Sequence, residues 1–157
     1  NTSARRLTIL GDFFHHHTGQ CERTMSLLAA WRAAHRSLEI DLIIGNHDRN
    51  SAPPPLEWNI HLDHKPARRP PFLLCHEPCR DDDLYVLSGH IHPGVRLSDS
   101  TGHGLTVPCF YFGEHHAMLP AFGGFTGTAR VHPQPGDAIF AVVDGEVIPL
   151  PRMAKAK

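Results

Sequence analysis

The sequence of 157 residues lacks long apolar runs and has no strong imbalance of charge. No apolar stretch approaches the roughly 18 residues that a membrane-spanning helix needs, and no signal-peptide pattern is present. The formal net charge is −1, so no overall field would attract a polyanion to the chain. These absences argue against a membrane-spanning or exported protein and favour a cytoplasmic location.

Cysteine is scarce, and no internal repeat is present. The four cysteines could form two disulfides, but their scattered positions favour reduced thiols in a cytoplasmic protein. Cys75 and Cys79 flank His76, which invites a zinc interpretation. Because no second Cys or His pair follows at the spacing of a zinc finger, we interpret both thiols as structural.

Histidine is abundant, with 14 residues, and several histidines follow apolar runs that predict strands. In an open α/β sheet, the carboxyl ends of the strands are where the chemistry is placed. Oxygen and imidazole ligands at four such ends indicate a metal centre. The four runs are residues 7–10 before Gly11-Asp12, residues 40–44 before Gly45-Asn46-His47-Asp48, residues 72–75 before His76, and residues 84–88 before Gly89-His90-Ile91-His92.

The first half of the chain predicts a βαβ unit with parallel strands. A helix is expected over residues 22–36, with one apolar side formed by Met25, Leu28, Trp31 and Ala34 at three-residue spacing. Its polar side would hold Arg23, Arg32 and Arg36. After two proline-rich interruptions, residues 59–62 and 72–75 predict short strands of a second sheet.

The second half predicts a series of short extended segments separated by turns. The turns are expected at residues 101–104, 135–137 and 144–145, and Asp144-Gly145 predicts a two-residue hairpin. We expect one α/β domain over residues 1–151, built of two packed sheets with helices outside, and a disordered basic tail over residues 152–157. The extended segments are residues 95–97, 105–110, 128–132, 138–143 and 146–150.

These motifs resemble those of the calcineurin-like metallophosphoesterases, whose pattern runs D-x-H, G-D, G-N-H-D/E, a lone His, and G-H-x-H. Four of the five motifs occur here in that order. The closest similarity is to a bacterial branch associated with a DNA ligase gene cluster, whose members are endonucleases of the DNA damage response. That similarity is carried by Gly11-Asp12-Phe13-Phe14-His15, by Gly89-His90-Ile91-His92-Pro93, and by residues 108–113 and 119–123.

The resemblance implies a four-layer αββα sandwich and a hydrolase that cleaves phosphodiester bonds, with DNA in repair as its substrate. It also implies two divalent metal ions that activate water, and mixed imidazole and oxygen ligands suit manganese, iron or zinc. Asp12 would bridge the two ions, and His92 would bind the first. Asn46, His76 and His90 would hold the second.

The resemblance also assigns the catalytic residues. His47 would protonate the leaving oxygen or stabilise the charge of the transition state. Asp48 would hold the His47 ring in orientation, although an Asp at this position could equally cap a turn. His15, which follows the bridging Asp in the pattern of the branch, would line the substrate groove.

One motif of the family is absent, because no Asp-x-His precedes Asp12. The eleven residues before it contain no acidic residue and no histidine. Asp12 and His92 alone are too few protein ligands for a tight first metal site. We therefore expect an N-terminally truncated chain rather than a degenerate copy, since decay would also have damaged the later motifs. Replacement of the lost ligands by His16 or His17 is disfavoured, since a loop rarely reproduces strand-end geometry.

Two other functions remain open at this point. The chain could be a phosphodiesterase for cyclic nucleotides or other small molecules. It could also be an inactive module that binds a single metal ion within a ligase-associated complex. The partners implied by the resemblance are DNA and ligase-associated repair proteins, and the sequence does not predict an oligomeric state.

Overall fold

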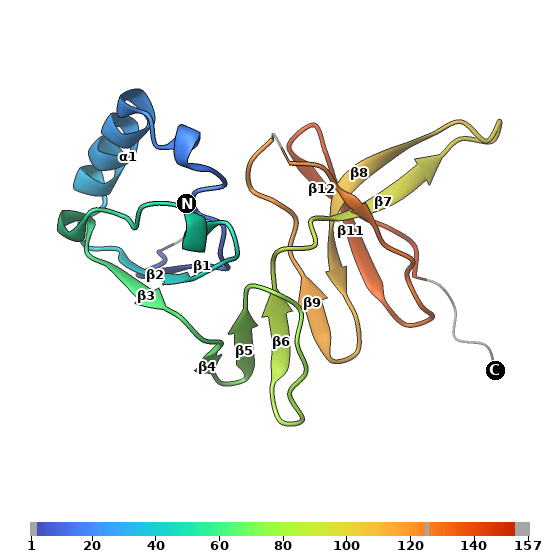
Figure 1. Cartoon of the computed structure of the whole chain (residues 1–157). Coiled ribbons are helices and arrows are strands. Elements are labelled where there is room, and N and C mark those ends of the chain that lie inside the picture. The colour runs from blue at the N-terminus through green and yellow to red at the C-terminus, as the bar shows by residue number, and fades with distance from the viewer. Residues whose placement is uncertain (1–2, 125, 153–157) are drawn as a thin grey trace. The chain divides into compact units, whose positions relative to one another are not determined.

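A computed structural model describes residues 3–124 and 126–152, which form two compact units (Figure 1). The first unit extends to Ala67 and includes Leu74–His76. The second comprises Arg68–Leu73 and the residues from Glu77 onward. Each unit is described by itself.

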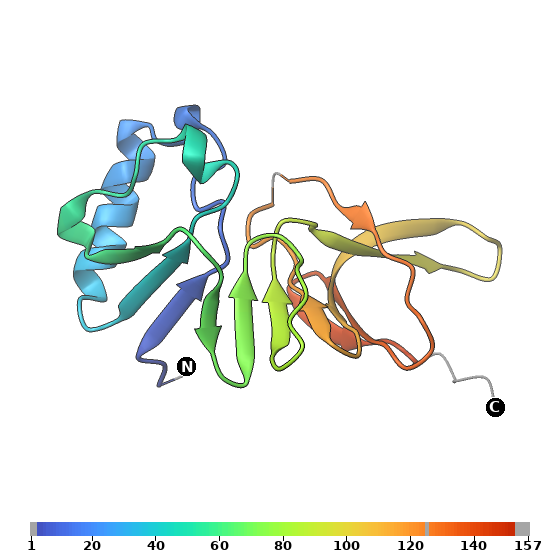
Figure 2. The same cartoon turned by 60° about the horizontal axis from the view of Figure 1, so that its bottom comes forward.

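The first unit is built on a parallel sheet of order β1-β2-β3 within the described residues. Its helix α1 follows β1 and precedes β2, as the predicted βαβ unit requires, and covers one face of this sheet (Figures 1 and 2). The elements are β1 (Arg6–Ile9), η1 (His17–Gly19), α1 (Glu22–Ala34), β2 (Glu39–Ile43), η2 (Asp48–Asn50), η3 (Leu56–Trp58) and β3 (Ile60–Asp63).

The strand β2 forms the centre of this sheet and is buried from Ile40 onward. Its residue Leu42 is fully buried and stands between Ile9 of β1 and Leu62 of β3 in the register. Residues that are paired across parallel strands share a face, so these three side chains form part of one apolar face. β2 therefore holds the first unit together and fixes where its strands end.

The strand β3 corrects one prediction. We expected residues 59–62 to belong to a second sheet, but β3 pairs with β2 in parallel orientation. The prolines before it interrupt the chain without ending the sheet, because Ile60 and Leu62 extend the apolar face that β2 begins. The strand predicted over residues 72–75 does belong to the larger sheet.

The helix α1 corrects a second prediction. It ends at Ala34, where the His35 N–H donates to the Arg32 carbonyl. Arg32 was expected on the polar side but is buried, with 7% of its surface exposed. Its guanidinium donates to the carbonyls of Trp58 and His35. The long aliphatic part of the arginine side chain can be buried while the guanidinium reaches carbonyls that would otherwise lack hydrogen-bond donors. The periodicity of apolar residues along a helix does not reveal such an arrangement.

The second unit is dominated by β-structure, in a sheet whose main path is β10-β7-β8-β9-β6-β5-β4. β11 pairs with β8 and with β12 in antiparallel orientation. Ala67 of β4 and the end of β5 from Leu74 count with the first unit. The strands are β4 (Ala67–Arg69), β5 (Phe72–Cys75), β6 (Tyr85–Ser88), β7 (Pro93–Ser98), β8 (Gly104–Phe112), β9 (His116–Met118), β10 (Ala129–Arg130), β11 (Ala138–Val143) and β12 (Glu146–Pro149).

Two predicted turns form hairpins. Asp144 and Gly145 both have left-handed backbone conformations, with φ of 50° and 81°, as the tight turn between β11 and β12 requires. In the turn between β7 and β8, the Asp99 carboxylate accepts hydrogen bonds from the backbone N–H groups of Thr101 and His103. Its bond from the Thr101 hydroxyl is the main reason that the pKa of Asp99 lies below its ordinary value.

The core of the second unit contains two ionisable groups. The Cys109 thiol is fully buried, and burial raises its pKa to about 11. The Tyr111 hydroxyl donates to the Asp137 carboxylate at 2.6 Å, and burial together with this bond raises its pKa to about 12. They pack with Val95, Val107, Ile139 and Ala141.

Cys21 and Cys109 are free, whereas Cys75 and Cys79 are disulfide-bonded. The expectation of reduced thiols is therefore wrong for Cys75 and Cys79, because the number and scattering of cysteines do not reveal which sulfur atoms meet in the folded chain.

Mixed α/β structure is confirmed for the described residues. None of their helices is long and apolar enough to cross a membrane.

We predict that the two free thiols differ strongly in reactivity toward Ellman's reagent at pH 8. Cys21 is exposed, and a hydrogen bond with the Thr24 hydroxyl lowers its pKa. Cys109, with a pKa of about 11, would be thiolate in only about one molecule in a thousand and is shielded from the reagent. One thiol should react rapidly, and the other only when urea unfolds the protein.

The variant Cys21→Ser should remove the rapid phase completely. Rapid reaction of two thiols in the native protein would contradict the burial of Cys109.

Candidate metal centre

The candidate centre of the first unit lies where the parallel strands β1 and β2 end. The turn after β1 contains Gly11 and Asp12, both in the left-handed region with φ of 89° and 53°. The turn after β2 carries residues 45–48. Because neighbouring parallel strands end at the same edge of a sheet, the two turns meet there.

The Asp48 carboxylate ties these turns together. One oxygen accepts the backbone N–H groups of Asp12 at 2.7 Å and Gly45 at 2.9 Å, and the other accepts that of Phe14 at 3.1 Å. Three backbone donors occupy this carboxylate, and among the described contacts none joins it to the His47 ring. The geometry therefore gives Asp48 the task of fixing turns, which was the alternative considered from the sequence.

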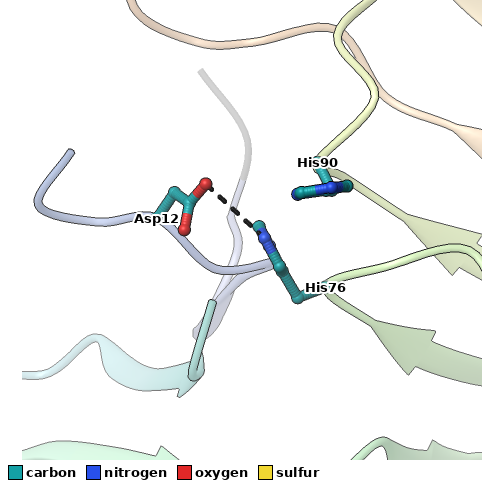
Figure 3. A group of neighbouring side chains, drawn as sticks. All are labelled: Asp12, His76 and His90. Carbon is teal, nitrogen blue, oxygen red and sulfur yellow. Dashed lines mark ion pairs between the residues drawn. The ribbon is translucent and has the colours of Figure 1, made fainter. Parts of the chain in front are cut away.

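The Asp12 carboxylate is held from one side only. Its Oδ1 accepts the backbone N–H of His47 at 3.0 Å. Its Oδ2 lies 3.5 Å from Nε2 of His76, and the side chain is 12% exposed (Figure 3). One hydrogen bond thus orients the carboxylate, and the second oxygen is directed toward an imidazole.

The His76 ring is buried and fixed by the backbone. Its Nδ1 lies 2.7 Å from the Leu10 carbonyl, which can only accept, so we assign the ring proton to Nδ1. Nε2 is then 2.9 Å from the Asn46 side-chain oxygen, Oδ1, as well as near Asp12 Oδ2. The sequence-predicted ligands Asp12, Asn46 and His76 are therefore brought together within one unit.

This arrangement fits a divalent cation. With the proton on Nδ1, three electron-rich atoms meet: a carboxylate oxygen, an amide oxygen and an imidazole nitrogen. They would repel one another unless a cation or a second ring proton lies among them. Oxygen and imidazole donors are those that manganese, iron and zinc accept in proteins. The donor set is thus one that could hold a divalent metal ion, and the ligand role of each residue stays a prediction.

Two glycines permit this close approach. A Cβ atom on Gly11 would lie 2.2 Å from Nδ1 of His76, and one on Gly45 would lie 2.2 Å from Oδ1 of Asp12. Both distances are far below van der Waals contact, so a larger residue would displace the ligands. Sequence reasoning included both glycines in motifs without giving them this role, although glycine directly after a strand was a signal for it. No signal identified the Leu10 carbonyl.

The two histidines expected near the substrate lie beside each other. The half-buried ring of His47 and the exposed ring of His15 are 4.1 Å apart between centroids, with planes inclined by 30°. His47 directly precedes η2 and donates its backbone N–H to Asp12. His15 thus contacts the residue that the resemblance makes catalytic.

His90 and His92 belong to the second unit, in the turn between β6 and β7. Both have left-handed conformations, with φ of 62° and 51°. Such conformations cost of the order of 1 kcal/mol each for residues other than glycine and are common at functional sites. The His92 carbonyl accepts the Ala129 N–H at 3.0 Å, which anchors the turn. Their role as ligands stays a prediction.

We predict that Gly45→Ala damages the centre. The added methyl group would collide with Asp12, so the turn must move, and we expect unfolding free energy to fall by about 1–3 kcal/mol. Urea denaturation measures this loss, and metal titration should show weaker binding. Gly19→Ala is the matched control, because its Cβ would meet no atom within 4 Å. Equal stability of both variants would contradict the packing described above.

Comparison with known proteins identifies a relative. No protein-family model matches the chain, and the comparison with curated proteins found no match. Among solved structures, the crystal structure of the Pseudomonas putida nuclease MPE matches with a TM-score of 0.81 and 38% sequence identity. The match covers 93% of this chain and 70% of the nuclease. The chain therefore belongs to the family of the Pseudomonas putida nuclease MPE.

Proposed function

We propose that this protein is a metal-dependent nuclease that hydrolyses phosphodiester bonds in DNA. Its family relationship to a nuclease supports the reaction class. The observation that supports metal dependence is the approach of the Asp12 carboxylate and the Asn46 side-chain oxygen to the His76 ring where β1 and β2 end. A divalent cation among these atoms would offset the repulsion between their lone pairs.

We further propose that His90 and His92 complete the ligand set for two divalent ions, manganese or alternatively iron or zinc, with Asp12 shared between them. When bound, such ions would supply a nucleophilic water near neutral pH and positive charge for the phosphate oxygens. The protein's own contribution is to hold the ligands in position. Asp12 is oriented by the His47 N–H, and His76 by the Leu10 carbonyl.

His47 is the proposed proton donor to the leaving oxygen. Two contacts support this role: its backbone N–H donates to the proposed ligand Asp12, and its ring contacts that of His15. Asp48 acts as a positioning residue, because it holds the Asp12 and Gly45 backbones instead of the His47 ring. His15 is proposed to line the path of the substrate.

The wider predictions belong to this proposal. The chain would form a single domain over residues 1–151 with the four-layer αββα sandwich of this branch of the metallophosphoesterases. It would act in DNA repair in the cytoplasm, together with ligase-associated proteins. The tail was predicted over residues 152–157, of which residues 153–157 lie outside the described residues.

We predict that His47→Ala separates turnover from metal binding. Loss of the proton donor should slow cleavage of a DNA oligonucleotide about 100-fold or more, while manganese affinity changes only a few-fold. Asp12→Ala should lose both cleavage and metal binding. Steady-state kinetics and isothermal titration with manganese measure the two effects, and His132→Ala, at an exposed residue of the second unit, is the control.

Three results would revise the proposal. Parallel losses of turnover and affinity in His47→Ala would make His47 a structural residue of the metal site. Turnover of a cyclic nucleotide without cleavage of DNA would indicate a small-molecule phosphodiesterase. One ion per chain that resists dialysis, without any turnover, would indicate a binding module.

A further inference from the structure

The His47 ring needs a support other than Asp48. Three backbone N–H groups bond to the Asp48 carboxylate, and no contact within the described residues joins it to that ring. A side chain that does contact the ring is His15, with centroids 4.1 Å apart. His15 is exposed and lies in the first loop, residues 10–21 between β1 and α1. His47 lies in the second loop, residues 44–55 after β2. The contact of the two rings therefore depends on how these loops are held together.

Two side chains of the second loop hold the residue before His15. The Asp48 carboxylate accepts the Phe14 N–H at 3.1 Å, and the Ser51 hydroxyl donates to the Phe14 carbonyl at 3.4 Å. The Phe14 side chain is also buried, with 5% of its surface exposed. Because Phe14 directly precedes His15, the first loop is attached to the second on the N-terminal side of His15.

Gln20 attaches the first loop on the other side of His15. Its side-chain N–H donates to the Ala52 carbonyl at 2.7 Å, and its side-chain oxygen accepts the Ala52 N–H at 3.1 Å. One side chain thus satisfies both backbone polar groups of a residue in the second loop. Because two bonds reach the same residue, they fix the relative orientation of the loops as well as their separation.

Both ends of this attachment lie next to ordered elements. Gln20 directly precedes Cys21, the N-cap residue of α1. Ala52 directly follows Ser51, the C-cap residue of η2. Pro53 comes next and restricts the Ala52 backbone to extended conformations. The attachment therefore sets where the first loop lies, because neither of its ends is free to follow the movement of that loop.

We propose that Gln20 is a positioning residue of the nuclease reaction, because it holds the first loop where the His15 ring lies against the His47 ring. The inference deepens the proposed function and rests on it. A proton donor must point at the leaving oxygen, and a misplacement of about 1 Å can slow a reaction about 100-fold. In this arrangement His15 limits the rotation of the His47 ring, and Gln20 limits the movement of His15.

Kinetics on the intact chain test this role. With manganese, Gln20→Ala should lower kcat for cleavage of a DNA oligonucleotide about tenfold, and KM should rise by a smaller factor. Manganese affinity should change less than about twofold, because Gln20 is not among the proposed ligands. Gln20→Met, which keeps the length of the side chain without its hydrogen bonds, should behave in the same way. The matched control is Gln134→Ala, at an exposed glutamine of the second unit whose side chain donates to the His132 carbonyl.

Two further measurements separate positioning from a general loss of structure. In proton NMR spectra, rings 4.1 Å apart give nuclear Overhauser effects between them, and His15→Ala and His47→Ala assign these signals. Gln20→Ala should weaken the effects, whereas Gln134→Ala should leave them unchanged. In a double-mutant cycle, Gln20→Ala should lower kcat no further when His15→Ala is already present, because Gln20 acts through His15.

Wild-type kcat in both Gln20→Ala and Gln20→Met would overturn the proposal, as would unchanged ring signals or fully additive losses with His15→Ala. The NMR experiment requires no activity, so it keeps this inference apart from the proposed function. If the wild type does not cleave DNA but Gln20→Ala loses the ring contact, the nuclease is refuted and the positioning of His15 by Gln20 stands. If the wild type cleaves DNA and Gln20→Ala keeps the ring contact, only this inference is refuted.

Discussion

The centre depends on the Asp48 carboxylate and the three backbone N–H groups that it accepts. These bonds join the turn after β1 to the turn after β2. A charged acceptor forms stronger hydrogen bonds than a neutral one, so one side chain substitutes for the regular bonding that both strands lose at their ends. The positions of Asp12 and His47 follow from this attachment.

The site also requires close packing of its side chains against the backbone of two glycines. Gly11 and Gly45 let His76 and Asp12 approach to distances that a methyl group would prevent. The His76 ring is then fixed by a backbone carbonyl, and its other nitrogen faces the oxygens of Asn46 and Asp12. Rigid backbone rather than a network of side chains therefore holds the ligand geometry. Such preorganisation is what electrostatic catalysis requires, since ligands that must first reorient lose binding energy.

Sequence patterns predicted the strand ends well and the environment of individual side chains poorly. The Asp144-Gly145 hairpin agrees with the structure. Asp12, Asn46 and His76 also lie close together, and their role as metal ligands stays a prediction. The sheet of β3, the burial of Arg32 and the bonded state of Cys75 and Cys79 do not. Each error concerns a partner distant in sequence or a side chain that bends back onto the backbone. Periodicity contains no information about either, because it records only which way a residue faces along its own element.

The sequence by itself determined which polar residues follow the strands and in what order, because glycine and polar residues directly after apolar runs mark the ends of strands. It also determined the parallel βαβ unit, since two neighbouring strands that are joined by a helix run parallel to each other. Only the tertiary structure decided what Asp48 binds and which carbonyl fixes His76. These depend on distances between residues that are 30 to 66 positions apart, and packing in three dimensions sets such distances.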